Sequence, residues 1–142
     1  MTRHSAHMIA KIASKAGFTG RGLTEAVAIA MHASQGDDTY ENTIWIEPPI
    51  RLRGLFGLNA TLLDESDRHM LFDPHYSAEQ LYDMYRAHGR TFKGHWAASD
   101  ALTEPNLKAL RAVISSRAES NPIEAPSTLA QMNYQQRYLN GS

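Results

Sequence analysis

The sequence predicts a mainly α-helical protein with one domain and an extended C-terminal arm. Its 142 residues are the usual length of a single domain. Apolar residues recur at helical spacing through much of the chain, whereas residues 43–46 indicate one short strand. From residue 120 onward, prolines, amides and tyrosines replace the helical pattern. We therefore expect a domain over residues 1–119 and an arm over residues 120–142.

Two helices are predicted near the N-terminus, on either side of a glycine-rich turn. The first follows Ser5, a typical N-cap residue, and ends at Gly17. Residues 17–22 hold three glycines and predict a turn. The second helix is predicted from Leu23 to Ala33. Its own small and apolar residues lie on all of its faces, which predicts that this helix is at the centre of the domain.

The middle of the chain contains a long connection and a third helix. Residues 34–53 lack a regular pattern, and connections of this length tend to be functional. Residues 54–59 place two glycines three positions apart, which predicts a tight bend or a close backbone approach. Ser77 and Gln80 form a capping-box pattern, so the third helix is predicted to begin there and to end before Gly89.

The last helix is predicted to begin after Thr103, with Pro105 in its first turn, and to end near Glu119. Each helix has one apolar stripe, and a domain of this size has one core to share among them. The residues expected to be largely buried in this core are Leu23, Val27, Ala30, Met31, Leu81, Met84, Tyr85, Leu110 and Ile114.

Composition excludes several classes of function. The formal net charge is −1, so a basic surface for nucleic acid or for a membrane is not expected. Cysteine is absent, which excludes disulfides, thiolate metal ligands and a cysteine nucleophile. The longest apolar run is far shorter than the ~20 residues that span a bilayer. The first residues lack the apolar stretch of a secretory signal, so we expect synthesis in a cytoplasm.

Two pairs of histidines have spacings that a metal site could use. His4 and His7 are three positions apart, and His69 and His75 flank Asp73. Neither pair has a third ligand at a suitable spacing. No metal and no cofactor is therefore expected.

Three carboxylates of the polar loop after the second helix could supply the acid and base of a glycoside cleavage. They are Asp37, Asp38 and Glu41. Because they lie near Gly36 in a polar segment, we expect them to cap turns and to face water.

Four motifs occur in an order that is typical of one known family. They are residues 16–36, residues 54–59 (Gly-Leu-Phe-Gly-Leu-Asn), residues 71–76 (Leu-Phe-Asp-Pro-His-Tyr) and residues 92–96 (Phe-Lys-Gly-His-Trp). This series resembles the lysozyme-like transglycosylase domain of the soluble lytic transglycosylase and goose-type lysozyme group, in the short form of actinobacterial and phage cell-wall proteins. The resemblance covers residues 16–101. It implies a single lysozyme-like domain related to peptidoglycan.

The sequence departs from the family pattern at two positions of the expected cleft. The family closes its second helix with Glu-Ser-Gly-Gly, and this glutamate protonates the glycosidic oxygen, whereas Ala33 stands in its place here. Gly57 replaces the glutamine of the family's Gly-Leu-Trp-Gln motif. General acid catalysis contributes about 10²–10⁴-fold in rate, and a methyl group cannot supply it. The resemblance therefore implies that no catalytic residue is intact, unless Asp37 or Asp38 reaches the vacated place.

The alanine has two explanations, a natural loss of the glutamate or a deliberate Glu→Ala change. The second departure, at Gly57, favours natural loss. The resemblance also implies a groove in which aromatic faces hold sugar rings. Its expected lining residues are Ala33, Ser34, Phe56, Asn59, Tyr76 and Trp96.

These inferences favour a structural protein of a phage virion, on the tail or the particle, whose cleft either holds peptidoglycan glycan weakly or serves only for packing. The arm is expected to dock on other virion subunits or on copies of this chain, through Leu129, Met132, Tyr134, Tyr138 and Leu139. One alternative is a peptidoglycan-cleaving lytic transglycosylase or endolysin seen as an inactive variant. Another is a cytoplasmic interaction module unrelated to peptidoglycan.

Overall fold

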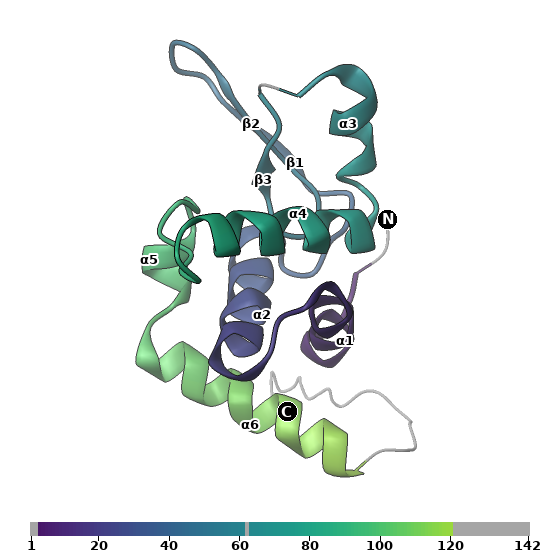
Figure 1. Ribbon diagram of the computed structural model, residues 1–142, viewed down its shortest axis with the longest axis vertical. Helices are drawn as coiled ribbons and strands as arrows, with labels where there is room; N and C mark the ends of the chain where they lie inside the picture. Colours follow the sequence, from purple (N-terminus) through teal and green to yellow (C-terminus); the bar gives the residue numbers. More distant parts are fainter. Residues whose placement is uncertain (1–2, 62, 121–142) are drawn as a thin grey trace.

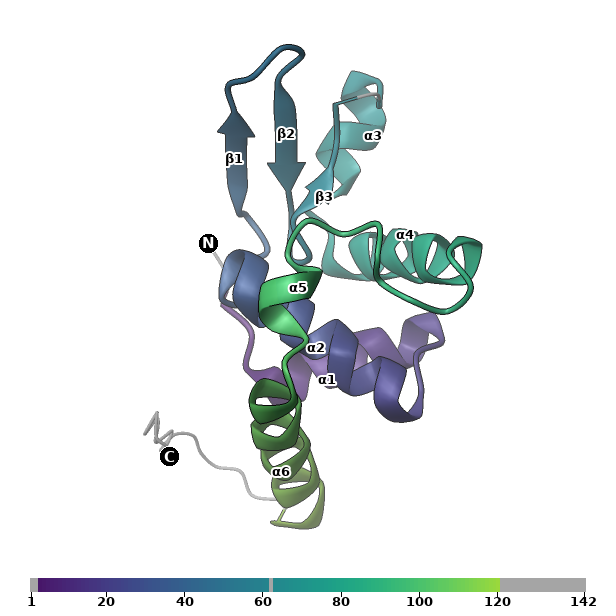
Figure 2. The same ribbon diagram turned by 90° about the vertical axis from the view of Figure 1, so that its left-hand side faces the viewer.

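The computed structural model describes residues 3–61 and 63–120 of the chain. These residues form a helical body from which a three-stranded antiparallel sheet projects (Figures 1 and 2). The helices are α1 (Ala6–Ala16), α2 (Gly20–Ser34), α3 (Glu65–Met70), α4 (Pro74–Ala87), α5 (Ala98–Ala101) and α6 (Glu104–Ser120). The strands are β1 (Glu41–Ile44), β2 (Ile50–Arg53) and β3 (Leu58–Asn59). The predicted mainly α-helical class is confirmed.

Helix α1 has the bounds that the sequence predicts. The hydroxyl of Ser5 accepts a hydrogen bond of 3.1 Å from the backbone N–H of Met8, which caps the first turn. Gly17 ends the helix with a φ of +128°. A side chain at Gly17 would meet the ring of Tyr82 on α4, so glycine serves both the backbone turn and the packing there.

Helix α2 begins at Gly20, earlier than the predicted start at Leu23. The prediction of a turn over residues 17–22 is therefore wrong for its second half. Gly22 lies buried inside the helix, and a Cβ atom there would collide with the hydroxyl of Tyr85 on α4. This glycine allows close packing of two helices and does not mark a turn. As predicted, α2 is central, because it packs against α1, α5 and α6.

The connection after α2 contains a β-hairpin, where only one short strand was predicted. Strand β1 pairs with β2, and Glu41 stands opposite Arg53 in the register and forms an ion pair of 2.7 Å with it. Strand β2 also pairs with β3. The predicted strand at residues 43–46 overlaps β1, whereas β2 was missed although its sequence, Ile-Arg-Leu-Arg, alternates apolar and polar residues.

Helix α4 begins at Pro74, so the predicted capping box at Ser77 and Gln80 is wrong. Asp73 is the N-cap, and its carboxylate accepts hydrogen bonds from the backbone N–H of His75 (2.9 Å) and of Tyr76 (3.4 Å). Proline is favoured in the first turn because it has no N–H to satisfy. Ser77 lies inside the helix and is fully buried.

Helix α6 follows Thr103, as predicted, and the Thr103 hydroxyl accepts a hydrogen bond of 3.4 Å from the backbone N–H of Asn106. Leu107 of α6 is fully buried in the core. Residues 121–142 of the arm predicted over residues 120–142 lie outside the described residues, so the domain boundary and the docking of the arm stay predictions. Among the described helices, none is long and apolar enough to cross a membrane.

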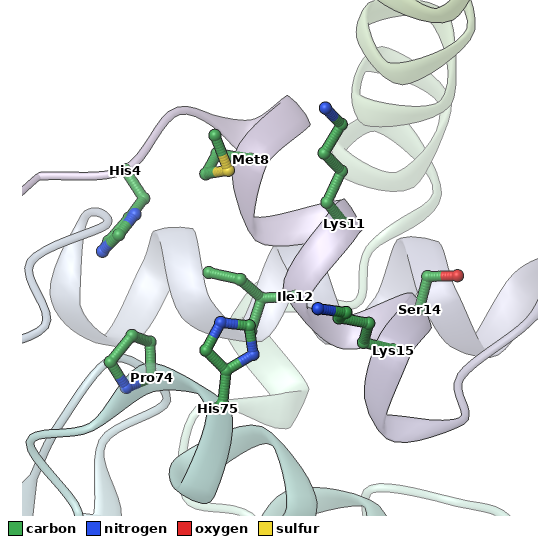
Figure 3. A pocket seen from close by; sticks show the side chains of 8 residues that line it. All are labelled: His4, Met8, Lys11, Ile12, Ser14, Lys15, Pro74 and His75. Atoms are coloured by element: carbon green, nitrogen blue, oxygen red, sulfur yellow. The ribbon is translucent and has the colours of Figure 1, made fainter.

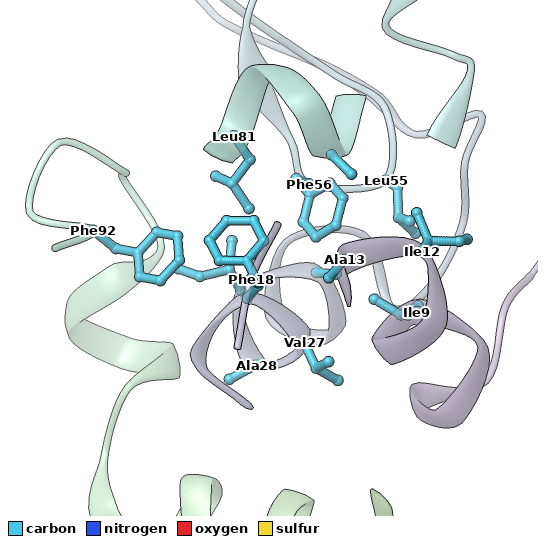
Figure 4. Close-up of a cluster of buried hydrophobic side chains, with 14 of the residues drawn as sticks. Ile9, Ile12, Ala13, Phe18, Val27, Ala28, Leu55, Phe56, Leu81 and Phe92 are labelled. Carbon is cyan, nitrogen blue, oxygen red and sulfur yellow. The ribbon is translucent and has the colours of Figure 1, made fainter. Parts of the chain in front are cut away.

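The core lies between α1, α2, α4 and the loop before β3 (Figure 4). Of the residues expected to be largely buried, Val27, Ala30 and Leu81 are buried. The others pack against the core while partly exposed, so their predicted burial was too deep: they are Leu23, Met31, Met84, Tyr85, Leu110 and Ile114. Connections between helices also contribute aromatic residues to the core. Phe18 and Phe92 come from two such connections, and their rings stack with centroids 5.7 Å apart.

Candidate functional site

The end of α2 and the loop before β3 meet at Ala33. This residue is buried, with 7% of its surface exposed. Gly57 of the loop has a φ of +59°. A Cβ atom at Gly57 would lie 3.0 Å from the Cβ of Ala33 and 3.2 Å from Cζ2 of Trp96. The fold therefore brings Ala33, Gly57 and Trp96 together at one point, where a side chain at position 57 would be in tight contact with both neighbours.

Trp96 covers this meeting point from the segment before α5. Its indole N–H donates a hydrogen bond of 2.8 Å to the carbonyl oxygen of Gly57. The side chain is 44% exposed, so a large part of the ring is open to solvent. A held and partly exposed indole offers an apolar face of the kind on which a sugar ring can lie.

His95 holds the same loop through a hydrogen bond to its backbone. The sequence analysis did not single out this residue. Its Nε2 lies 2.6 Å from the carbonyl oxygen of Phe56, and the backbone N–H of Ala97 donates to Nδ1 at 3.0 Å. These partners require the neutral tautomer that carries its proton on Nε2. Burial lowers the pKa of His95 below its ordinary value, although the bond to Phe56 opposes this shift.

Ser34 is buried and ties the end of α2 to the loop. Its hydroxyl lies 2.6 Å from the carbonyl oxygen of Leu55 and 3.1 Å from that of Ala30, and it accepts a bond from the N–H of Gly36. These backbone partners use the hydroxyl, so Ser34 positions the site and does not offer it a free polar group. A role of Ser34 in binding a ligand stays a prediction.

Phe56 is fully buried in the core, so its ring has no exposed face in this structure, and its predicted role in binding a sugar has no support from its position (Figure 4). Asn59 lies exposed on β3, where its side-chain oxygen accepts a hydrogen bond of 2.9 Å from the N–H of Thr61. Tyr76 lies in the first turn of α4, half-buried against the core. Roles for Asn59 and Tyr76 in binding stay predictions.

The carboxylates after α2 are already engaged in the fold. Asp37 accepts hydrogen bonds from both the backbone N–H and the hydroxyl of Thr39 (2.8 and 2.7 Å), and the hydroxyl is the main cause that lowers the pKa of this carboxyl. Asp38 lies 3.0 Å from Nε2 of His4. These hydrogen bonds and the lowered pKa favour the ionised carboxylate of Asp37, which suits a general acid poorly. As expected, Asp37 instead caps a turn.

Metal-binding geometry is not found in residues 3–61 and 63–120, where no three side chains of His, Asp or Glu gather as a ligand set.

A further exposed aromatic residue that the sequence analysis did not single out is Trp45. It is 80% exposed in the turn between β1 and β2.

The family described as lysozyme-like domain matches residues 10–98, which is more than half of the chain. The chain therefore belongs to the lysozyme-like domain family. This match confirms the resemblance to a lysozyme-like transglycosylase domain and the single lysozyme-like fold. No curated protein matches the chain.

Proposed function

We propose that this domain binds the glycan of peptidoglycan without cleaving it. One observation carries the proposal: Ala33, Gly57 and Trp96 meet where the resemblance places a catalytic glutamate and a glutamine. A methyl group, a glycine and an indole provide contact area but no proton donor for the glycosidic oxygen. The lysozyme-like fold supports a peptidoglycan-related role, and the composition of the meeting point supports binding over chemistry.

Clearing of purified peptidoglycan tests this proposal. The chain and an Ala33→Glu variant are compared with an active lysozyme as a positive control. We expect no clearing by either protein, because Gly57 also lacks the glutamine side chain that the family carries in the cleft, so restoring the glutamate alone leaves the site incomplete. Clearing by the unchanged chain would contradict the proposal and favour a lytic transglycosylase or endolysin. Clearing by the Ala33→Glu variant alone would mean that the glutamate is the only catalytic group that this domain lacks.

We also propose that the domain is part of a phage particle, where a glycan-binding module meets the cell wall during infection. Support comes from the resemblance to short phage members of the family and from the apolar side chains of residues 121–142. Such a segment binds a neighbouring subunit more readily than it stays solvated. Mass spectrometry of purified particles checks whether the chain is a component.

Deletion of residues 121–142 tests the role of the arm. Because Leu107 already anchors α6 in the core, we expect a folded domain with little change in Tm. We expect the truncated chain to be missing from particles or oligomers. Unfolding of the truncated chain would mean that the arm packs on its own domain.

A further inference from the structure

A groove lies between α1 and the beginning of α4, on residues that the Ala33 site does not use (Figure 3). Its volume is about 610 Å³. Met8, Ile12 and Pro74 supply apolar surface, and Lys11, Lys15 and His75 supply basic groups. In Figure 3, Ile12 lies between Met8 and the ring of His75, and the amino group of Lys15 points toward the same space.

The two lysines carry charge that the fold leaves unpaired. Lys11 and Lys15 are four residues apart, so they lie one above the other on the same side of α1. Helix α1 contains no acidic residue. In the part of the chain that the structure describes, neither lysine forms an ion pair, whereas Arg53 pairs with Glu41 and Arg68 with Glu65.

Two acidic residues next to lining residues, Asp38 and Asp73, are engaged within the fold. Asp38 lies 3.0 Å from Nε2 of His4, which also lines the groove. Asp73 caps the first turn of α4 through the backbone N–H of His75. Among the residues that line the groove there is no Asp or Glu, and Lys11 and Lys15 give its lining a positive charge.

The floor of the groove is apolar. Ile12 is buried, and Met8 is 43% exposed although it is a large apolar side chain. Methionine is flexible and adapts its shape to a partner. A ligand that covered this floor would remove apolar surface from water, at roughly 25 cal/mol per Å².

We propose that this groove binds an acidic peptide segment of a partner protein in an extended conformation. The segment places an apolar side chain on Met8 and Ile12 and two carboxylates on Lys11 and Lys15. One helical turn separates the lysines by ~5–6 Å, which is close to the ~7 Å between alternate side chains of an extended peptide. Charge complementarity selects an acidic segment, and the apolar floor selects a peptide over a simple phosphate polymer.

The test uses the full chain and a fluorescein-labelled peptide with the core Leu-Ser-Asp-Ser-Asp. Its matched control replaces both aspartates with asparagine. Fluorescence anisotropy should give saturable binding of the acidic peptide that weakens as salt rises, because exposed charge pairs are screened. We expect the asparagine peptide to bind at least tenfold more weakly. Equal affinities, or displacement of the peptide by an equal concentration of inorganic phosphate, would overturn the proposal.

Protein variants locate the binding. We expect the double variant Lys11→Gln and Lys15→Gln to bind the acidic peptide at least tenfold more weakly. The control Lys108→Gln removes an exposed lysine from α6 and should leave the affinity unchanged. Thermal melting checks that each variant is folded. NMR amide shifts should change at residues 8–15 and at His75 and Tyr76. Changes centred elsewhere, or equal losses of affinity in both protein variants, would overturn the assignment.

Discussion

The indole N–H of Trp96 donates to the carbonyl oxygen of Gly57, and the preceding side chain, His95, bonds to the preceding carbonyl oxygen, that of Phe56. Two consecutive side chains thus hold two consecutive backbone carbonyls of the loop. The rings of His95 and Trp96 stack, with centroids 5.6 Å apart. The segment before α5 therefore fixes the loop against Ala33 and fixes the exposed indole at the same time.

Trp96 should be the main contact of the domain with glycan. We expect Trp96→Ala to lower the affinity for chitooligosaccharides or muropeptides by about twofold to twelvefold, which corresponds to the loss of an aromatic face worth about 0.5–1.5 kcal/mol. Binding should be weak, because the glutamate and glutamine expected from the family are missing. Titration of tryptophan fluorescence measures the affinity of the unchanged chain, and calorimetry measures that of the variants.

The chain has two tryptophans, so the fluorescence signal needs an assignment. Trp45→Phe removes the indole of the β1–β2 turn and should leave both the signal change and the affinity intact. A signal that disappears with Trp45 would move the glycan contact to the hairpin. No fluorescence change at millimolar ligand would mean that the site at Ala33 and Trp96 has no glycan ligand.

Gly54 should be intolerant of any side chain. Its φ is +85°, and a Cβ atom there would collide with the carbonyl oxygen of Leu71. Gly89 provides a matched control, since its φ is +68° and no atom lies within 4 Å of such a Cβ. We expect Gly89→Ala to cost about 1–2 kcal/mol of unfolding free energy from backbone strain alone. Gly54→Ala should cost clearly more in urea denaturation, and equal costs would contradict the close approach.

Val27 tests the core. It is fully buried on α2, so Val27→Asp places an unpaired carboxylate among apolar atoms, at a cost of several kcal/mol. We expect this variant to be unfolded by circular dichroism. Val113→Asp on α6 is the control, because that side chain is 47% exposed and should tolerate the change. A folded Val27→Asp with an unchanged melting temperature would contradict the packing described for α2.

Helix ends were predictable from sequence where one side chain supplies the cap. Ser5 and Thr103 each accept a backbone N–H in the first turn of their helices, as predicted. At α4 two signals lie within four residues, and the helix begins at the earlier one because Asp73 caps it and Pro74 suits its first turn. Ser77 then falls inside the helix, facing the core.

Contacts that depend on loops were not predictable. Phe18, Phe56 and Phe92 come from connections, where apolar periodicity carries no information, yet all three are buried. The sequence pairs Ala33 with Gly57 only through the family resemblance. Their contact depends on the positive φ of Gly57 and on the bonds from His95 and Trp96, which become visible only in the structure.

His95 should make the stability of the domain depend on pH. An unfolded histidine titrates near 6.5, and burial lowers the pKa of His95 in the folded state. The folded state therefore binds fewer protons than the unfolded state between these two pKa values. The contribution of His95 to the free energy of unfolding is therefore complete above pH 6.5, and it is lost as the pH falls through the pKa of the folded state. A protonated ring would also lose Nδ1 as the acceptor of the Ala97 N–H.

The free energy of unfolding, measured by urea denaturation between pH 7.5 and 5, checks this prediction. His95→Gln keeps a side-chain donor for Phe56 but does not titrate, so its stability should fall less steeply with decreasing pH, whatever its absolute value. His69→Gln changes an exposed histidine of α3 and should keep the slope of the unchanged chain. If His95→Gln shows the same slope as the unchanged chain, His95 is not the group whose protonation destabilises the loop at Ala33.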